Sequence, residues 1–141
     1  MKAKILVIDD DPDVLRLLQV TLESAGYSPS LAGDGETALR RIEADHPDLV
    51  LLDVMMPLLD GWAVLEQVGT MQHPPRVVVI SAKAGQRDVA RGLALGACEY
   101  VTKPFRLDAL VATVGDVLRR PPGDQERLRR STLAALRTTA P

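Results

Sequence analysis

The stretch Asp48-Leu49-Val50-Leu51-Leu52-Asp53, followed by Val54-Met55-Met56-Pro57, decides the fold of this chain. Four consecutive apolar residues between polar flanks predict a short strand that is buried on both faces, as in the centre of a parallel sheet. The strand ends on the carboxylate of Asp53. Because ligands of open α/β sheets bind beyond the carboxyl ends of the strands, Asp53 is a candidate functional residue.

Similar short apolar segments precede and follow this strand along the chain. They lie at residues 4–8, 27–32, 77–80 and 98–101. Apolar residues with helical spacing predict helices at about 12–25, 37–44, 62–69, 86–95 and 107–118. Strands that alternate with helices in this way are typical of right-handed βαβ crossovers. We therefore predict an α/β fold with a doubly wound, five-stranded parallel sheet flanked by five helices.

Composition and charge divide the chain near residue 120. Its 141 residues, of which 46% are hydrophobic, suffice for one domain with a substantial core, predicted at residues 1–120. Residues 121–141 are predicted to form a basic tail or linker, with a short helix as an option, because Pro121-Pro122-Gly123 interrupts the pattern. Six arginines against two acids make residues 119–141 basic, but such charge alone is weak evidence for nucleic acid binding. No direct nucleic acid binding is expected from residues 1–120.

Cysteine usage and hydropathy bear on the compartment. Cys98 is the only cysteine of the chain, so an internal disulfide is excluded. No apolar run is long enough to span a membrane, and the run near the N-terminus is too short for the core of a signal peptide. These features predict a cytoplasmic protein that does not act in a membrane.

Polar side chains are predicted to gather at the carboxyl ends of four strands. Asp9 and Asp10 follow the first strand, Asp53 ends the third, Ser81 follows the fourth and Lys103 follows the fifth. Three carboxylates in one crevice repel one another unless a cation neutralises them, and their hard oxygens suit Mg²⁺. A lysine and a hydroxyl beside the ion could hold a phosphoryl group. The pattern therefore predicts Mg²⁺-dependent phosphoryl transfer that involves a carboxylate nucleophile, with Asp53 central.

Taken in order, these segments resemble the receiver domain of bacterial two-component response regulators, which has a CheY-like fold. The resemblance covers about residues 3–120 and is specific because every segment stands in its place. Between residues 96 and 120 the chain is most similar to receivers that carry a winged-helix output domain, although Thr113 stands where they usually have an arginine for dimer pairing. The matching segments are Val7–Asp11, Leu51–Pro57 with Asp60-Gly61, Val79–Ala82, Gly96-Ala97 and Tyr100–Phe105.

The resemblance implies a role for each residue of the predicted site. Asp53 would accept a phosphoryl group from a histidine kinase or a phosphotransfer protein. Asp10 and Asp53 would bind Mg²⁺ directly, with Mn²⁺ as a substitute, while Asp9 would bind mostly through water and Met55 through its backbone carbonyl. Lys103 would pair with the phosphoryl oxygens, and its bond to the following proline is expected to be cis.

The resemblance also implies how the site would signal. Ser81, where threonine is commoner, would turn toward the phosphoaspartate, and Tyr100 would move from an outward to an inward rotamer. This would couple the site to the face formed by the helix after Ser81, the fifth strand and the last helix of the domain. Met55 and Lys83 are predicted to tune the lifetime of the phosphoaspartate. A downstream protein, an output domain missing from this chain or a phosphorylation-dependent homodimer would receive the signal.

Two other functions compete with this hypothesis. A degenerate receiver would be a constitutive interaction module, but the intact Asp9, Asp10, Asp53 and Lys103 argue against it. A haloacid-dehalogenase-like phosphatase also uses a strand-end aspartate with Mg²⁺, but it needs a second acid where this chain has Met55. The sequence therefore favours a switch that catalyses only its own phosphorylation and dephosphorylation, and not an enzyme with an external substrate.

Overall fold

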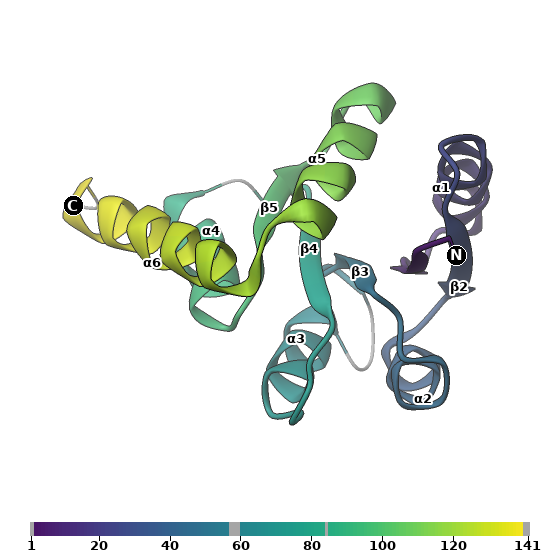
Figure 1. The fold of residues 1–141 in the computed structure, drawn as a ribbon, viewed down its shortest axis with the longest axis horizontal. Coiled ribbons are helices and arrows are strands. Elements are labelled where there is room, and N and C mark those ends of the chain that lie inside the picture. Colours follow the sequence, from purple (N-terminus) through teal and green to yellow (C-terminus); the bar gives the residue numbers. More distant parts are fainter. Residues whose placement is uncertain (1, 57–59, 84, 140–141) are drawn as a thin grey trace.

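The short apolar segments pair into one sheet in the computed structural model, which describes residues 2–56, 60–83 and 85–139. The strands are β1 (Lys4–Ile8), β2 (Ser28–Ala32), β3 (Leu49–Asp53), β4 (Arg76–Ser81) and β5 (Glu99–Thr102). They are parallel throughout and lie in the order β2-β1-β3-β4-β5 (Figure 1). The chain therefore runs first toward one edge of the sheet and then, from β3 onward, toward the other.

Helices connect the consecutive strands and follow the last one. They are α1 (Pro12–Ser24), α2 (Gly35–Asp45), α3 (Gly61–Gly69), α4 (Gln86–Ala94), α5 (Leu107–Arg119) and α6 (Pro122–Thr139). The predicted doubly wound, five-stranded parallel fold with flanking helices is thereby confirmed, and each predicted element differs from the observed one by only a few residues at its ends.

Two hydrophobic cores lie on the two faces of the sheet. Helices α1 and α5 cover one face, and α2 and α3 cover the other (Figure 1). Side chains of a strand alternate between faces, so Ile5 and Leu49 join the first core while Leu6 and Val50 join the second. All five residues of β3 are buried, and burying each leucine contributes about 1.5–3 kcal/mol. This packing holds the carboxyl end of β3 in a fixed position.

Local signals set where the helices begin and where an edge strand is tolerated. Asp11 caps α1 by accepting a hydrogen bond from the Asp13 N–H at 2.9 Å, with Pro12 in the first turn. Asp60 caps α3 in the same way through the Ala63 N–H. Pro29 lacks an N–H, and it lies in β2, which pairs only with β1 at the edge of the sheet.

The region after residue 120 is more ordered than the predicted tail. It forms α6, a helix of 18 residues that packs against α4 (Figure 1). Of the residues of α6, Leu128 is exposed, whereas Gln125 and Leu133 are buried. The division of the chain into a domain and a tail at residue 120 stays a prediction. Within the described residues, no helix has the length and apolar character needed to cross a bilayer.

Candidate functional site

The acidic residues meet where the order of strands reverses. Asp9 directly follows β1 and Asp53 ends β3, and these two strands are neighbours in the sheet. Such a reversal opens a crevice beyond the carboxyl ends of the strands. One ligand atom from each of Asp9, Asp10 and Asp53 lies within 4.8 Å of the others. The structure therefore brings together the three carboxylates that the sequence singled out.

Lys103 reaches this cluster from the loop after β5. Its backbone N–H donates to the Ser81 carbonyl oxygen at 2.8 Å, which extends the pairing of β4 and β5 by one residue. The bond from Lys103 to Pro104 is cis, as expected. The Lys103 Nζ lies 3.1 Å from Asp9 Oδ2 and 3.3 Å from Asp53 Oδ2. The ammonium group thus bridges two carboxylates from two different strand ends.

Backbone amides hold the other oxygen of each bridged carboxylate. Asp53 Oδ1 accepts a hydrogen bond from the Met55 N–H at 2.9 Å, and Asp9 Oδ1 accepts one from the Asp11 N–H at 2.9 Å. Asp9 is only 3% exposed and Asp53 only 5%, whereas Asp10 is exposed. The two buried carboxylates are therefore oriented by the chain itself, each with Oδ2 facing Lys103.

The electrostatics of the cluster are dominated by burial and by repulsion between acids. Burial raises the pKa of Asp9, and the charge of Asp53 adds to that effect, although the Asp11 N–H and Lys103 oppose it. Burial alone would lower the pKa of Lys103, but the hydrogen bond to Asp9 and the charges of Asp53 and Asp9 leave this pKa above its ordinary value. Lys103 is therefore protonated at neutral pH and offsets part of the negative charge.

The donor set fits a hard divalent cation. Three carboxylates against one ammonium leave excess negative charge in a partly buried crevice, and their oxygens are the ligands that Mg²⁺ prefers. Asp10, the exposed member, leaves one side of the cluster open to water and to a ligand. The part assigned to the Met55 carbonyl stays a prediction, and Pro57 of the same motif lies outside the described residues.

The predicted switch residues lie on neighbouring strands, Ser81 at the end of β4 and Tyr100 in β5. Ser81 is fully buried, and its Oγ accepts a hydrogen bond from the Lys83 N–H at 3.0 Å. The Tyr100 hydroxyl donates to the Lys83 carbonyl oxygen at 2.6 Å. Burial raises the pKa of Tyr100, and a hydrogen bond with the Ser81 side chain partly offsets this. Tyr100 thus contacts both Ser81 and the segment that leads into α4; the switching role of both residues stays a prediction.

Two glycines near these residues were not assigned a role from the sequence. A Cβ at Gly61 would overlap the backbone of Asp53 and Val54, so the start of α3 lies directly against the carboxyl end of β3. A Cβ at Gly92 in α4 would lie 3.0 Å from Cδ2 of Tyr100. The motif that contains Gly61 could have pointed to the first contact, whereas nothing in the sequence around Gly92 indicates the second.

Asp9→Asn should stabilise the metal-free protein at pH 7. Because the pKa of Asp9 is raised on folding, its contribution to stability is present below the ordinary value of 3.8 and is lost as the pH rises toward the folded value. Asparagine removes this ionisation while keeping the shape of the side chain. Thermal unfolding in EDTA should shift upward by about 3–5 °C, which corresponds to about 1 kcal/mol.

The gain of Asp9→Asn should shrink at pH 3, below the ordinary pKa of 3.8, where Asp9 itself is largely protonated in both states. Added Mg²⁺ should stabilise the variant less than the wild type. Asp45→Asn, at an exposed position on α2, is the matched control and should change the midpoint at pH 7 little. An unchanged or lower midpoint for Asp9→Asn at pH 7 would contradict the electrostatic argument.

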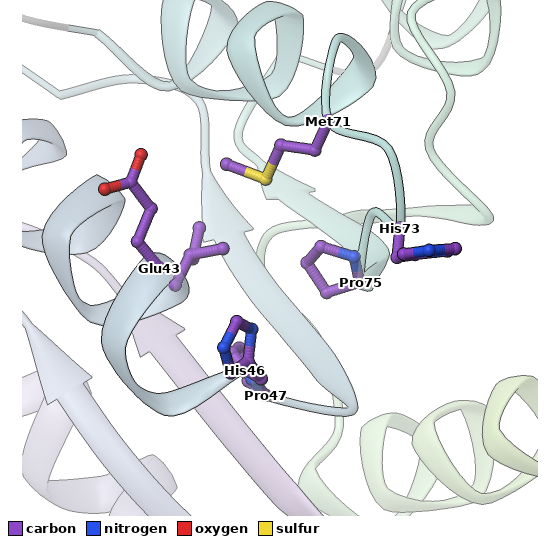
Figure 2. Close-up of a pocket in the computed structure, with 7 residues that line it drawn as sticks. Glu43, His46, Pro47, Met71, His73 and Pro75 are labelled. Carbon is purple, nitrogen blue, oxygen red and sulfur yellow. The ribbon is translucent and has the colours of Figure 1, made fainter.

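A second hollow, of about 330 Å³, lies at the opposite end of the sheet, between the end of α2 and the loop before β4. Its polar residues are Glu43, His46 and His73. Figure 2 shows Met71 reaching into the hollow, while the His73 ring and the Glu43 carboxylate point away from each other. These polar groups do not converge on one point, so the acidic cluster remains the candidate site.

Comparisons with known proteins agree with this geometry. The family model described as "Response regulator receiver domain" matches residues 5–115. The chain is 43% identical over 120 residues to the alkaline phosphatase synthesis transcriptional regulatory protein PhoP of Bacillus subtilis, a match that covers 85% of this chain and 50% of PhoP. It is also 43% identical over 117 residues to the transcriptional regulatory protein PrrA of Mycobacterium leprae, covering 83% of this chain and 50% of PrrA. The chain thus spans about half the length of these relatives.

The solved structures give the same result. The receiver domain of the Francisella response regulator 1452 superposes with a TM-score of 0.81 at 32% identity, and the match covers 84% of this chain and 98% of that one. The segment that the family model matches contains every residue of the acidic cluster together with Lys103. The strand order, the cluster at the reversal point and these similarities agree, and the chain belongs to the response regulator receiver domain family.

Proposed function

We propose that this protein is a phosphorylation-dependent switch of a two-component system, in which Asp53 accepts a phosphoryl group from a histidine kinase or a phosphotransfer protein. One observation carries the proposal: the buried Asp53 carboxylate is held by the Met55 N–H, faces the Lys103 ammonium and adjoins the carboxylates of Asp9 and Asp10. A nucleophilic carboxylate, a cationic clamp and a cation site are the parts that phosphoryl transfer needs.

The transfer exchanges one bond to phosphorus for another. An oxygen of Asp53 forms the new P–O bond while the P–N bond to the donor histidine breaks and the imidazole leaves. The Lys103 ammonium, which lies 3.3 Å from Asp53 Oδ2, binds oxygens of the phosphoryl group. The Ser81 hydroxyl donates a hydrogen bond to a further phosphoryl oxygen. Mg²⁺ bound by Asp9, Asp10, Asp53 and the Met55 carbonyl would neutralise charge on the carboxylates and on the phosphoryl group.

The signal leaves the site through the face formed by α4, β5 and α5. Ser81 turns toward the phosphoaspartate, Tyr100 follows it, and the contacts of Tyr100 with Ser81 and Lys83 support this coupling. The receiver of the signal is a downstream protein, an output domain outside this chain or a second copy of the chain. Met55 and Lys83, whose side chains are both exposed, tune the lifetime of the phosphoaspartate by controlling the access of water to it. We place the protein in the cytoplasm.

The phosphatase alternative is weaker in the structure as well as in the sequence. The position two residues after Asp53 is Met55, whose 47% exposed side chain offers no acid to protonate a leaving group. A constitutive module would not require the bridge from Lys103 to both Asp9 and Asp53. We therefore propose that the protein turns over no external substrate and modifies only itself.

The wild-type protein should gain one phosphoryl group from acetyl phosphate when Mg²⁺ is present and none when EDTA replaces it. Intact mass gives the number of groups added, and fragmentation of the modified peptide identifies the residue. Mn²⁺ should substitute for Mg²⁺, because both are hard cations that accept carboxylate ligands. An equal gain in EDTA, or no gain under any condition, would reject the proposed chemistry.

A further inference from the structure

Helix α6 covers part of the face through which the signal is proposed to leave. It lies along α4 on the β5 side of the sheet (Figure 1). Arg129 Nη1 donates to the Leu93 carbonyl oxygen of α4 at 2.7 Å, and Gln125 Nε2 donates to the Cys98 carbonyl oxygen at 3.4 Å. Leu133 is the apolar anchor of the helix and is 8% exposed. We call the region around Leu93, Cys98 and Tyr100 the α4–β5 surface.

The start of α6 is held by charged groups at the edge of the sheet. Arg120 forms an ion pair with Glu99 of β5 at 2.8 Å and donates to Gln125 Oε1 at 3.1 Å. The guanidinium of Arg76 in β4 donates to the carbonyl oxygen of Arg120. The chain between α5 and α6 is therefore tied to β4 and β5 at Arg120, and a movement of α6 away from the α4–β5 surface would leave this attachment in place.

Packing beneath α6 is incomplete. A cavity of about 210 Å³ remains between α6 and the α4–β5 surface, lined in part by Tyr100, Leu128 and Thr132. Leu128 is 42% exposed although it lies on the rim of this cavity. One buried leucine and a few hydrogen bonds make a much weaker attachment than the full apolar stripe with which α1 or α5 packs on the sheet.

Tyr100 connects this helix to the phosphorylation site. Its hydroxyl donates to the Lys83 carbonyl oxygen, and the Lys83 N–H donates to Ser81 Oγ. The Tyr100 side chain also lines the cavity under α6. If the Ser81 hydroxyl turns to a phosphoryl group on Asp53, it gives up the hydrogen bond from the Lys83 N–H, and the Lys83 segment that holds the Tyr100 hydroxyl loses this anchor. The Tyr100 ring, which is bonded to Lys83 and lines the cavity under α6, would then be free to move, and this movement would change the surface on which α6 docks.

On the basis of the function proposed above, we propose that α6 is a releasable cover of the α4–β5 surface, docked when Asp53 is unmodified and loosened when Asp53 is phosphorylated. The cover and an external partner would then compete for one surface. The docking of α6 and the phosphorylation of Asp53 are thermodynamically linked: if phosphorylation weakens the docking of α6, the docked helix makes phosphorylation less favourable by the same free energy.

The chain carries its own reporter of this docking. Cys98 is the only cysteine and is 8% exposed. It joins the core that α5 covers and also lines the cavity under α6. A thiol reagent such as iodoacetamide reacts only when the covering groups move away, so the alkylation rate of the folded protein follows the population in which Cys98 is exposed. A comparison of matched variants of α6 isolates the part of this protection that α6 provides. Intact mass counts alkyl and phosphoryl groups on the same molecule.

Two adjacent arginines provide a matched test of the cover. Arg129 and Arg130 both pair with Glu126, but only Arg129 also reaches Leu93 on α4, and the Arg130 side chain is 76% exposed. Alkylation of Cys98 should become about threefold faster or more in Arg129→Ala and should stay near the wild-type rate in Arg130→Ala. Equal rates in the two variants would show that α6 does not protect Cys98 and would overturn the inference.

Phosphorylation of Asp53 provides a second test of the docking of α6. With acetyl phosphate and Mg²⁺, phosphorylated wild-type molecules should be alkylated faster than unmodified molecules in the same tube, and Asp53→Asn should show no acceleration. A phosphoryl gain with an unchanged or slower alkylation rate would overturn this inference and leave the proposed function intact. Absence of any phosphoryl gain would overturn both, and the same mass spectrum distinguishes the two failures.

Discussion

Asp53→Asn should take up no phosphoryl group from acetyl phosphate and Mg²⁺ under conditions in which the wild-type protein gains one. The amide is close to the carboxylate in size, so the bond from the Met55 N–H to the side-chain oxygen can persist. It carries no negative charge, however, and it neither attacks phosphorus nor attracts the Lys103 ammonium. The expected effect is complete loss of modification, measured by intact mass over a time course.

Asp48→Asn is the matched control because it makes the same chemical change next to the other end of the same strand. Asp48 is exposed, and its carboxylate accepts a hydrogen bond from the Lys4 N–H at 2.8 Å, far from the acidic cluster. This variant should be modified like the wild type. If Asp53→Asn were still modified and Asp48→Asn were not, the acceptor would lie at the wrong end of the sheet and the site assignment would be wrong.

The central strands could be predicted because their burial leaves a simple trace in the sequence. A strand covered by helices on both faces must be apolar at every position, and β3 is buried at all five of its residues. The acidic cluster follows from the same pattern, since parallel strands bring their carboxyl ends to one edge. The proximity of Asp9, Asp10 and Asp53 could therefore be predicted without knowledge of their side-chain conformations.

Contacts that depend on side-chain conformation could not be predicted in this way. The sequence places Lys103 after β5, but the bridge from its Nζ to two carboxylates is a property of the folded loop. The docking of α6 was even less predictable from the sequence. Its residues alternate charged and apolar without a full stripe, and it is attached through Arg129 and through Gln125, a buried polar residue. Such attachments leave no hydrophobic pattern to find.

Gly61→Ala should destabilise the protein by about 2–3 kcal/mol, because the helix α3 begins in direct contact with the strand that ends on Asp53. A Cβ at this position would approach the Val54 Cα and the Asp53 carbonyl oxygen far more closely than real Cβ atoms do, and would lie 2.9 Å from the Asp53 carbonyl carbon. These are backbone atoms, which cannot rotate away as a side chain can. The thermal midpoint should fall by roughly 10 °C.

Helix propensity alone predicts that Gly61→Ala stabilises the protein, so the experiment separates the steric overlap with β3 from the effect of helix propensity. Gly61 is the first residue of α3, where alanine would favour the helix by up to about 1 kcal/mol over glycine. Gly33 directly follows β2, at the same carboxyl ends of the strands, and no atom lies within 4 Å of the position that its Cβ would take. Gly33→Ala should therefore change the thermal midpoint little. Because the overlap at Gly61 falls on the carbonyl of Asp53, phosphorylation of the surviving folded protein should also slow. A Gly61→Ala variant as stable as Gly33→Ala would show that α3 can move away from the acceptor strand at little energetic cost.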